Sequence, residues 1–255
     1  MRSFYVNIRV AGPLTQGSII NHCLAKQYSG QVWGLIITPR CDLAHDNKVS
    51  NVHYLPIVDF SDFMEEDGRD YLFRKWCDKR YRKFEKSCSK YQFPIKGMKQ
   101  EHYEKMANEK IENTSERNEF LQCLRNYYAC NSENEDFKKS IESSKYDLIK
   151  NLMEDKIPSY YLIEDWDSHK KKAKVILLKE LKRISYESAK MLGCGMEKGS
   201  VVSGYDELNL NIPDTDLYHV CAEVRSPFIE HIMQRFSYNF CRVGVDDRNI
   251  LDMNL

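Results

Sequence analysis

The first 60 residues alternate between apolar runs and short polar breaks, a pattern that predicts β-strands. Residues 4–10 place apolar and polar side chains in turn, which suits a strand with one face in water, and Gly12-Pro13 ends it. Further apolar segments predict strands at 18–24, 32–37 and 52–58. The run Trp33-Gly34-Leu35-Ile36-Ile37 has no polar position at all. We therefore expect it to be a central strand, buried on both faces.

Beyond residue 60 the apolar positions take on helical spacing. One stripe, with members three or four residues apart, consists of Phe73, Trp76, Cys77, Tyr81, Phe84 and Cys88. It predicts an amphipathic helix whose cations point away from the stripe. Those cations are Arg74, Lys79, Arg82, Lys83 and Lys86. Helices are also predicted at 100–111, 114–128 and 136–155, with Thr114 or Ser115 as the N-cap of the second.

Strand patterns return after this helical block. Residues 160–163 and 174–178 flank a polar turn with a basic tip and predict a hairpin, and 216–224 predicts a last strand. The chain then enters its clearest helix, for which Ser226 is the expected N-cap and Pro227 the expected first residue. Gly244 is expected to end that helix.

These elements predict an α+β fold. We expect an SH3-like β-barrel that residues 1–60 begin and residues 158–255 complete. A charged helical insertion, residues 61–157, interrupts it, and the C-terminal helix packs on it. Two side-by-side domains are the alternative.

Composition narrows the class of protein. Lys plus Arg and Asp plus Glu both number 38, so net charge favours neither nucleic acid nor membrane as a partner. No apolar run reaches bilayer length and no secretory signal opens the chain, which indicates a soluble, cytoplasmic protein. The nine cysteines are scattered without a C-x-x-C motif, so we expect neither a disulfide framework nor a zinc ribbon.

The densest polar cluster follows the predicted central strand. It offers Thr38, Arg40, Asp42 and His45 as candidate catalytic residues, because functional loops commonly follow buried strands. The alternative is a structural loop, in which Asp42 forms an Asx-turn. Cys41 and His45 are candidates to join His22, Cys23 or His53 around a metal, but no spacing matches a zinc pattern, so we expect no metal and no cofactor.

Two sets of cations are candidates for binding nucleic acid or another anion. The first consists of Arg74, Lys79, Arg82, Lys83 and Lys86, in a stretch that holds eleven Lys or Arg and three acids from Arg69 to Gln100. Residues 101–155 reverse that balance, with eight cations against thirteen acids. The second set is His231, Arg235 and Arg242, which share one flank of the last helix with Tyr238. For each set, an ordinary helix surface that is solvated or paired with acids is the alternative.

Two resemblances extend this reading. Gly17-Ser18-Ile19-Ile20, Trp33 to Pro39 and Leu55-Pro56-Ile57-Val58 resemble the opening of the MazF/PemK toxin barrel. That resemblance implies an SH3-like barrel with Thr38 at the family's active-site Ser/Thr position, although Gln31-Val32 stands where those ribonucleases have Arg-Pro.

The second resemblance covers both ends of the chain. Pro39-Arg40-Cys41-Asp42, the Tyr-Tyr-Leu strand at 160–162 and the helix beginning Ser226-Pro227-Phe228 are similar to a poorly characterised group of bacterial phage-defence-associated proteins. It implies a defence context.

Three functions remain open on the sequence. The first is an intracellular interaction module of a bacterial defence or toxin system, which binds a partner protein, such as a neighbouring ATPase or nuclease, or RNA or DNA. The second is an endoribonuclease-like hydrolase with its site at the barrel rim. The third is a purely structural subunit of a complex. None of them requires a membrane.

Overall fold

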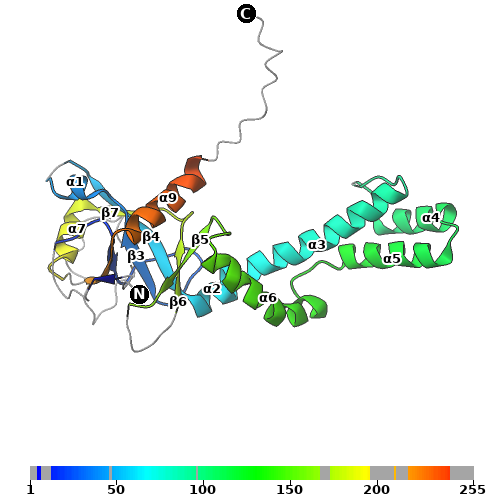
Figure 1. The fold of residues 1–255 in the computed structure, drawn as a ribbon, viewed down its shortest axis with the longest axis horizontal. Coiled ribbons are helices and arrows are strands. Elements are labelled where there is room, and N and C mark those ends of the chain that lie inside the picture. Colours follow the sequence, from blue (N-terminus) through cyan, green and yellow to red (C-terminus); the bar gives the residue numbers. More distant parts are fainter. Residues whose placement is uncertain are drawn as a thin grey trace, which may run out of the picture. The chain divides into compact units, whose positions relative to one another are not determined.

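The computed structural model describes residues 5–6, 13–45, 48–95, 97–166, 173–195, 210 and 218–241. It is a mixed α+β protein whose chain divides into two compact units (Figure 1). The sheet unit comprises residues 1–64 and 151–255, and the helical unit comprises residues 65–150. None of the helices in the described part of the chain combines the length and the apolar composition that crossing a bilayer requires.

One antiparallel sheet, curled into half a barrel, is the framework of the sheet unit. Its strands are β1 (Tyr5–Val6), β2 (Ser18–Ile20), β3 (Val32–Ile36), β4 (Asn51–Asp59), β5 (Tyr160–Glu164), β6 (Ala173–Leu177), β7 (Lys182–Ser185) and β8 (Val220–Val224). Their order is β1-β8-β2-β3-β4-β6-β5, and β7 also pairs with β4. Late strands thus lie beside early ones at two places, which confirms that two distant β-rich portions build one sheet.

The centre of the sheet follows from the apolar pattern. Strand β3 lies between β2 and β4 and is buried at every residue except Trp33, which is half-buried, so its predicted central place is confirmed. Strand β4 serves two further partners: Asn51–Tyr54 pair with β7, and Ile57–Asp59 pair with β6. Pro56 falls between these two ladders, where its missing N–H is not needed.

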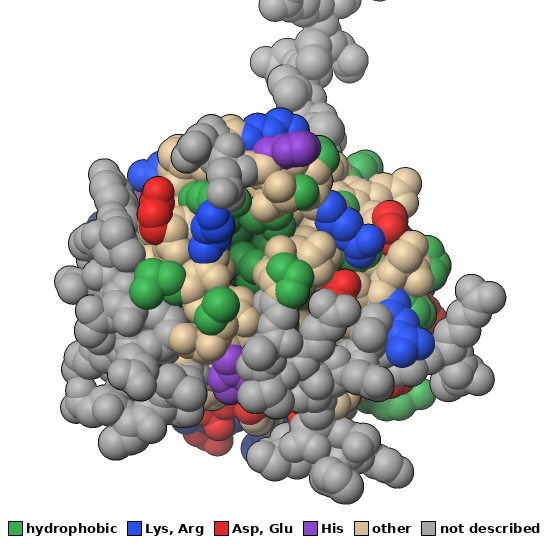
Figure 2. All heavy atoms as spheres, turned by 90° about the vertical axis from the view of Figure 1, so that its left-hand side faces the viewer, with side chains coloured by type: hydrophobic (Ala, Val, Ile, Leu, Met, Phe, Trp, Pro, Cys, Tyr) green, Lys and Arg blue, Asp and Glu red, His purple; other side chains and the backbone are tan. Residues whose placement is uncertain are grey.

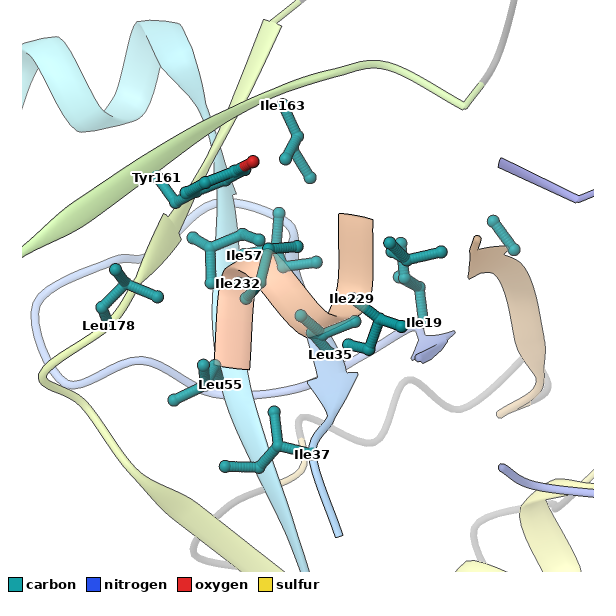
Figure 3. Close-up of a cluster of buried hydrophobic side chains, with 13 residues drawn as sticks. Ile19, Leu35, Ile37, Leu55, Ile57, Tyr161, Ile163, Leu178, Ile229 and Ile232 are labelled. Carbon is teal, nitrogen blue, oxygen red and sulfur yellow. The ribbon is translucent and has the colours of Figure 1, made fainter. Parts of the chain in front are cut away.

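Helix α9 (Phe228–Cys241) covers one face of the sheet. Ile229 and Ile232 from this helix pack among Ile19, Leu35 and Ile57 from three strands (Figure 3). The helix begins after Pro227, and the N–H groups of Phe228 and Ile229 both donate to the carbonyl of Arg225. The prediction of Ser226 as N-cap and Pro227 as first residue was therefore misplaced by one position. Gly244 lies outside the described residues.

Three short helices complete the sheet unit. They are α1 (Arg40–Leu43), α2 (Phe60–Phe63) and α7 (Tyr186–Leu192). The Ser185 hydroxyl caps α7 by accepting a hydrogen bond from the N–H of Ser188. The polar segment after β3 begins with the single turn of α1, because the Pro39 carbonyl accepts from the N–H groups of Asp42 and Leu43.

The helical unit contains α3 (Arg69–Lys90), α4 (Gln100–Lys110), α5 (Thr114–Tyr128) and most of α6 (Glu135–Met153). All four predicted helices are confirmed. The N-cap of α5 was predicted one or two residues too late, because the side chain of Asn113 accepts from the N–H groups of Ser115 and Glu116. This unit has its own core, in which Phe84, Tyr103 and Phe120 are fully buried. A turn of π-helix, Met64–Gly68, connects α2 to α3.

Candidate functional site

Of the four residues that the sequence nominated for catalysis, Thr38 and Asp42 make structural contacts, whereas Arg40 and His45 are exposed. Thr38 is only 4% exposed, and its hydroxyl accepts a hydrogen bond of 2.7 Å from the backbone N–H of His53. It therefore ties the end of β3 to β4. Arg40 opens α1 and is exposed, as is His45 just beyond that helix.

Asp42 is the centre of a small surface cluster. Its carboxylate pairs with the ammonium group of Lys48, and the Cys41 thiol donates to Oδ1 at 3.5 Å. The hydrogen bond from Lys48 lowers the pKa of Asp42, with smaller contributions from Cys41 and the nearby His45. A carboxylate held ionised in this way is a poor proton acceptor. Asp42 is thus held by Lys48 and Cys41, while the Thr38 hydroxyl links β3 to β4.

The last helix uses its polar flank to hold the segment that leads into β5. The His231 ring lies 2.9 Å from the Tyr161 hydroxyl through Nδ1 and 3.8 Å from the Asp155 carboxylate through Nε2. Arg235 donates to the carbonyl of Ile157 at 3.2 Å.

One turn further along α9, Asn239 donates to the carbonyl of Pro158 at 2.7 Å. The structure therefore brings His231 and Arg235 together as parts of a packing seam. Arg242, the third predicted member of this anion set, lies outside the described residues, as does the basic tip of the β5–β6 hairpin.

The cations of α3 form a different kind of surface. Arg74, Lys79, Arg82, Lys83 and Lys86 are all exposed, and so is Lys75. Among the described residues none of these six forms an ion pair, whereas Arg80 of the same helix pairs with Asp136. The helix therefore presents unneutralised positive charge along its length. This is the arrangement expected of a surface that meets phosphate.

The face of the sheet unit that carries α1 and α7 differs from α3 in the distribution of its charges. Figure 2 shows Lys and Arg side chains there as separate groups among hydrophobic and uncharged atoms. The described part of this face has no continuous basic area (Figure 2). Of the nominated surfaces in the described chain, α3 is therefore the one that concentrates charge of a single sign.

The residues considered as metal ligands do not assemble. In the described part of the chain, no group of three or more His, Cys, Asp or Glu side chains is placed to hold a metal ion. Cys41 is exposed on the rim, whereas Cys23 is buried beneath the sheet, where burial raises the pKa of its thiol well above the usual range.

His219 and Cys221, which lie two residues apart, were not singled out by sequence analysis. The Asn21 side chain accepts from the N–H of His219 through Oδ1 at 2.9 Å, so its Nδ2 faces Nδ1 of the imidazole at 3.1 Å. On the other side of the ring, Nε2 lies 4.0 Å from the Cys221 thiol, which donates to the backbone carbonyl of His219 at 3.9 Å.

A buried lysine also escaped it. Lys174 on β6 is paired with Asp59, and its ammonium group lies over the rings of both Trp33 and Trp166, whose centres are 5.2 Å apart. The sequence contains the partners of this lysine, Trp33, Trp166, Asp59 and Asp165, near strand ends, but they are far apart in the chain. Only the strand pairing of β3, β4 and β6 brings them together.

No family model, no curated protein and no solved structure matches the chain.

Proposed function

We propose that this protein is a cytoplasmic interaction module of a bacterial defence or toxin system, and that its helical unit binds nucleic acid through the cations of α3. The observation that carries the proposal is the row of exposed cations on that helix that form no ion pair with any residue the structure describes. Lys and Arg that lack acidic partners are free to release counterions from a phosphate backbone, which is the main source of sequence-independent affinity.

The proposal also assigns the half-barrel to a fold family. We propose that the curled sheet is a relative of the SH3-like barrel of MazF and PemK toxins, with β2, β3 and β4 as the shared strands. Hydrolysis at the rim receives less support. The Thr38 hydroxyl is occupied by the backbone of β4, and Asp42 is paired with Lys48.

Binding of a fluorescent nucleic acid to the full chain tests the proposal. We expect binding at low salt that weakens steeply as salt rises, because the contacts are ionic. The double variant Arg82→Glu and Lys83→Glu should lose at least tenfold in affinity, since it places two repulsive charges on the binding face.

The matched control is Lys105→Glu with Lys110→Glu, which makes the same change in net charge on α4. Equal losses in the two variants would show that net charge alone drives binding and would overturn the assignment to α3. Absence of binding to any nucleic acid at low salt, together with capture of a neighbouring ATPase or nuclease, would replace nucleic acid with a protein partner.

A further inference from the structure

The cations of α3 lie on one arc of the helix. At 3.6 residues per turn, Lys75, Lys79, Arg82, Lys83 and Lys86 fall within about 100° of the circumference and extend over roughly 16 Å of the axis. All five are exposed. The two acids of this stretch, Asp78 and Glu85, fall outside the arc by the same arithmetic. We call these five cations the basic arc.

Most aromatic side chains of α3 point away from this arc and are engaged within the helical unit, whereas the half-buried Tyr71, in the first turn, falls about 20° beyond the edge of the arc. Trp76 lies against Phe137 at 5.5 Å between ring centres, and the guanidinium group of Arg80 covers Trp76 at 3.4 Å.

The rings nearer the end of α3 are engaged in the same way. Phe84 is stacked on Tyr127 at 4.6 Å, and Tyr81 meets the same Tyr127 ring at 5.9 Å. These rings are therefore used for packing and are not available beside the cations.

This separation of charge from aromatic surface decides how a nucleic acid can be held. Proteins that hold single strands place aromatic rings beside cations, and each stacked base contributes about 1–3 kcal/mol. Among the described residues of α3, only Tyr71 lies near the arc, beside its first turn, so most contacts of the basic arc are limited to phosphates. Phosphate contacts position a nucleic acid without reading its bases. A duplex also releases more counterions per contact than a single strand does, with slopes of about 0.9 and 0.7.

From this geometry we infer that the basic arc binds double-stranded nucleic acid through its backbone alone, without preference for sequence, and binds the corresponding single strand more weakly. This inference rests on the proposed function. It adds the class of ligand and the absence of base recognition.

Fluorescence anisotropy with the full chain tests the inference. The probes are a mixed-sequence DNA duplex of twenty base pairs, a second duplex of the same length and different sequence, and one strand of the first duplex. We expect the two duplexes to bind within twofold of each other and the single strand to bind at least fivefold more weakly. For five contacts, the logarithm of the association constant should fall with the logarithm of salt concentration with a slope of about −4.5.

The variant Lys79→Gln with Lys83→Gln should lower that slope by about 2 and weaken both duplexes by the same factor. The control Lys105→Gln with Lys110→Gln, on α4, should keep the wild-type slope. Tighter binding of the single strand, or a difference between the duplexes above tenfold, would overturn this inference while leaving nucleic-acid binding in place. Failure to bind any probe at low salt would overturn the proposed function as well.

Discussion

The ammonium group of Lys174 lies 2.6 Å from Oδ1 of Asp59 and 3.5 Å from the centre of the Trp33 ring. Its side chain is only 4% exposed, and Asp165, also 4% exposed, lies on its other side at 3.9 Å. A lysine in this position loses its hydration, and the two carboxylates and the indole ring offset that loss. The cluster joins the end of β4 to β6 and to the residues after β5.

Replacement of this lysine should destabilise the sheet unit. We expect Lys174→Met to lower the free energy of unfolding by about 3 kcal/mol, because removing one partner of a buried ion pair leaves the other without its compensating charge. Urea unfolding followed by circular dichroism measures the loss. The exposed Lys179, on the turn after β6, provides the control, and Lys179→Met should change stability by less than about 0.5 kcal/mol.

The double variant Lys174→Met with Asp59→Asn should be more stable than the sum of the two single changes implies, since the pair is then removed together. Additive losses, or a Lys174→Met protein as stable as the wild type, would show that the pair is not coupled.

Gly34 on β3 should not tolerate a side chain. A Cβ at this position would lie 2.6 Å from the Cys23 thiol and 2.8 Å from the Tyr54 ring, and both of those residues are fully or almost fully buried. We expect Gly34→Ala to cost about 1–3 kcal/mol through overpacking, measured as a shift of the urea midpoint.

Gly30→Ala is the matched control. A Cβ at Gly30 meets only the end of the Asp62 side chain, which can rotate away. If the two alanine variants are equally stable, the packing around Gly34 is looser than the structure describes.

Tyr161 makes the stability of the sheet unit sensitive to alkaline pH. Burial raises the pKa of its hydroxyl to about 12, with a smaller rise from Asp155 that Arg235 opposes. In the unfolded chain this hydroxyl loses its proton near the usual pKa of about 10. The unfolded state is therefore stabilised as the pH rises above 10, and the folded state loses up to about 2–3 kcal/mol by pH 12.

Tyr161→Phe removes this ionisation. The free energy of unfolding of that variant should decline less steeply than that of the wild type between pH 10 and 12, while other buried tyrosines contribute equally to both. Tyr146→Phe, at a position that is 74% exposed, should retain the wild-type decline. Parallel declines for wild type and Tyr161→Phe would contradict the raised pKa.

The fold was predictable where the apolar pattern was continuous or had a single period. Strands β3 and β6 follow continuous apolar runs, whereas buried positions repeat every two residues in β5 and every three to four in the helices of the helical unit. Strand β7 was missed because only Ile184 is buried among its four residues and two of the others are cations. Its strand state comes from pairing with the first half of β4, which no local pattern encodes.

The candidate sites were less predictable because they depend on side-chain direction. Composition correctly placed cations on the outside of α3, since a helix with one apolar stripe must expose the rest. It did not show that Thr38 turns inward to β4 or that the flank of α9 is used to hold residues 155–161. Those contacts join elements distant in the chain, and their partners are mostly backbone carbonyls and N–H groups, which every residue supplies.

The place of the helical unit, between β4 and β5, fixes an order of events on the ribosome. Strand β4 emerges before every residue of α3, α4 and α5, whereas β6 and β7, which cover one edge of β4, emerge only afterwards. During translation that edge of β4 stays uncovered for the time needed to synthesise the helices, and an apolar strand with an unpaired edge is a site for wrong association. We therefore expect the nascent chain to be most prone to wrong association while the helical unit is being made.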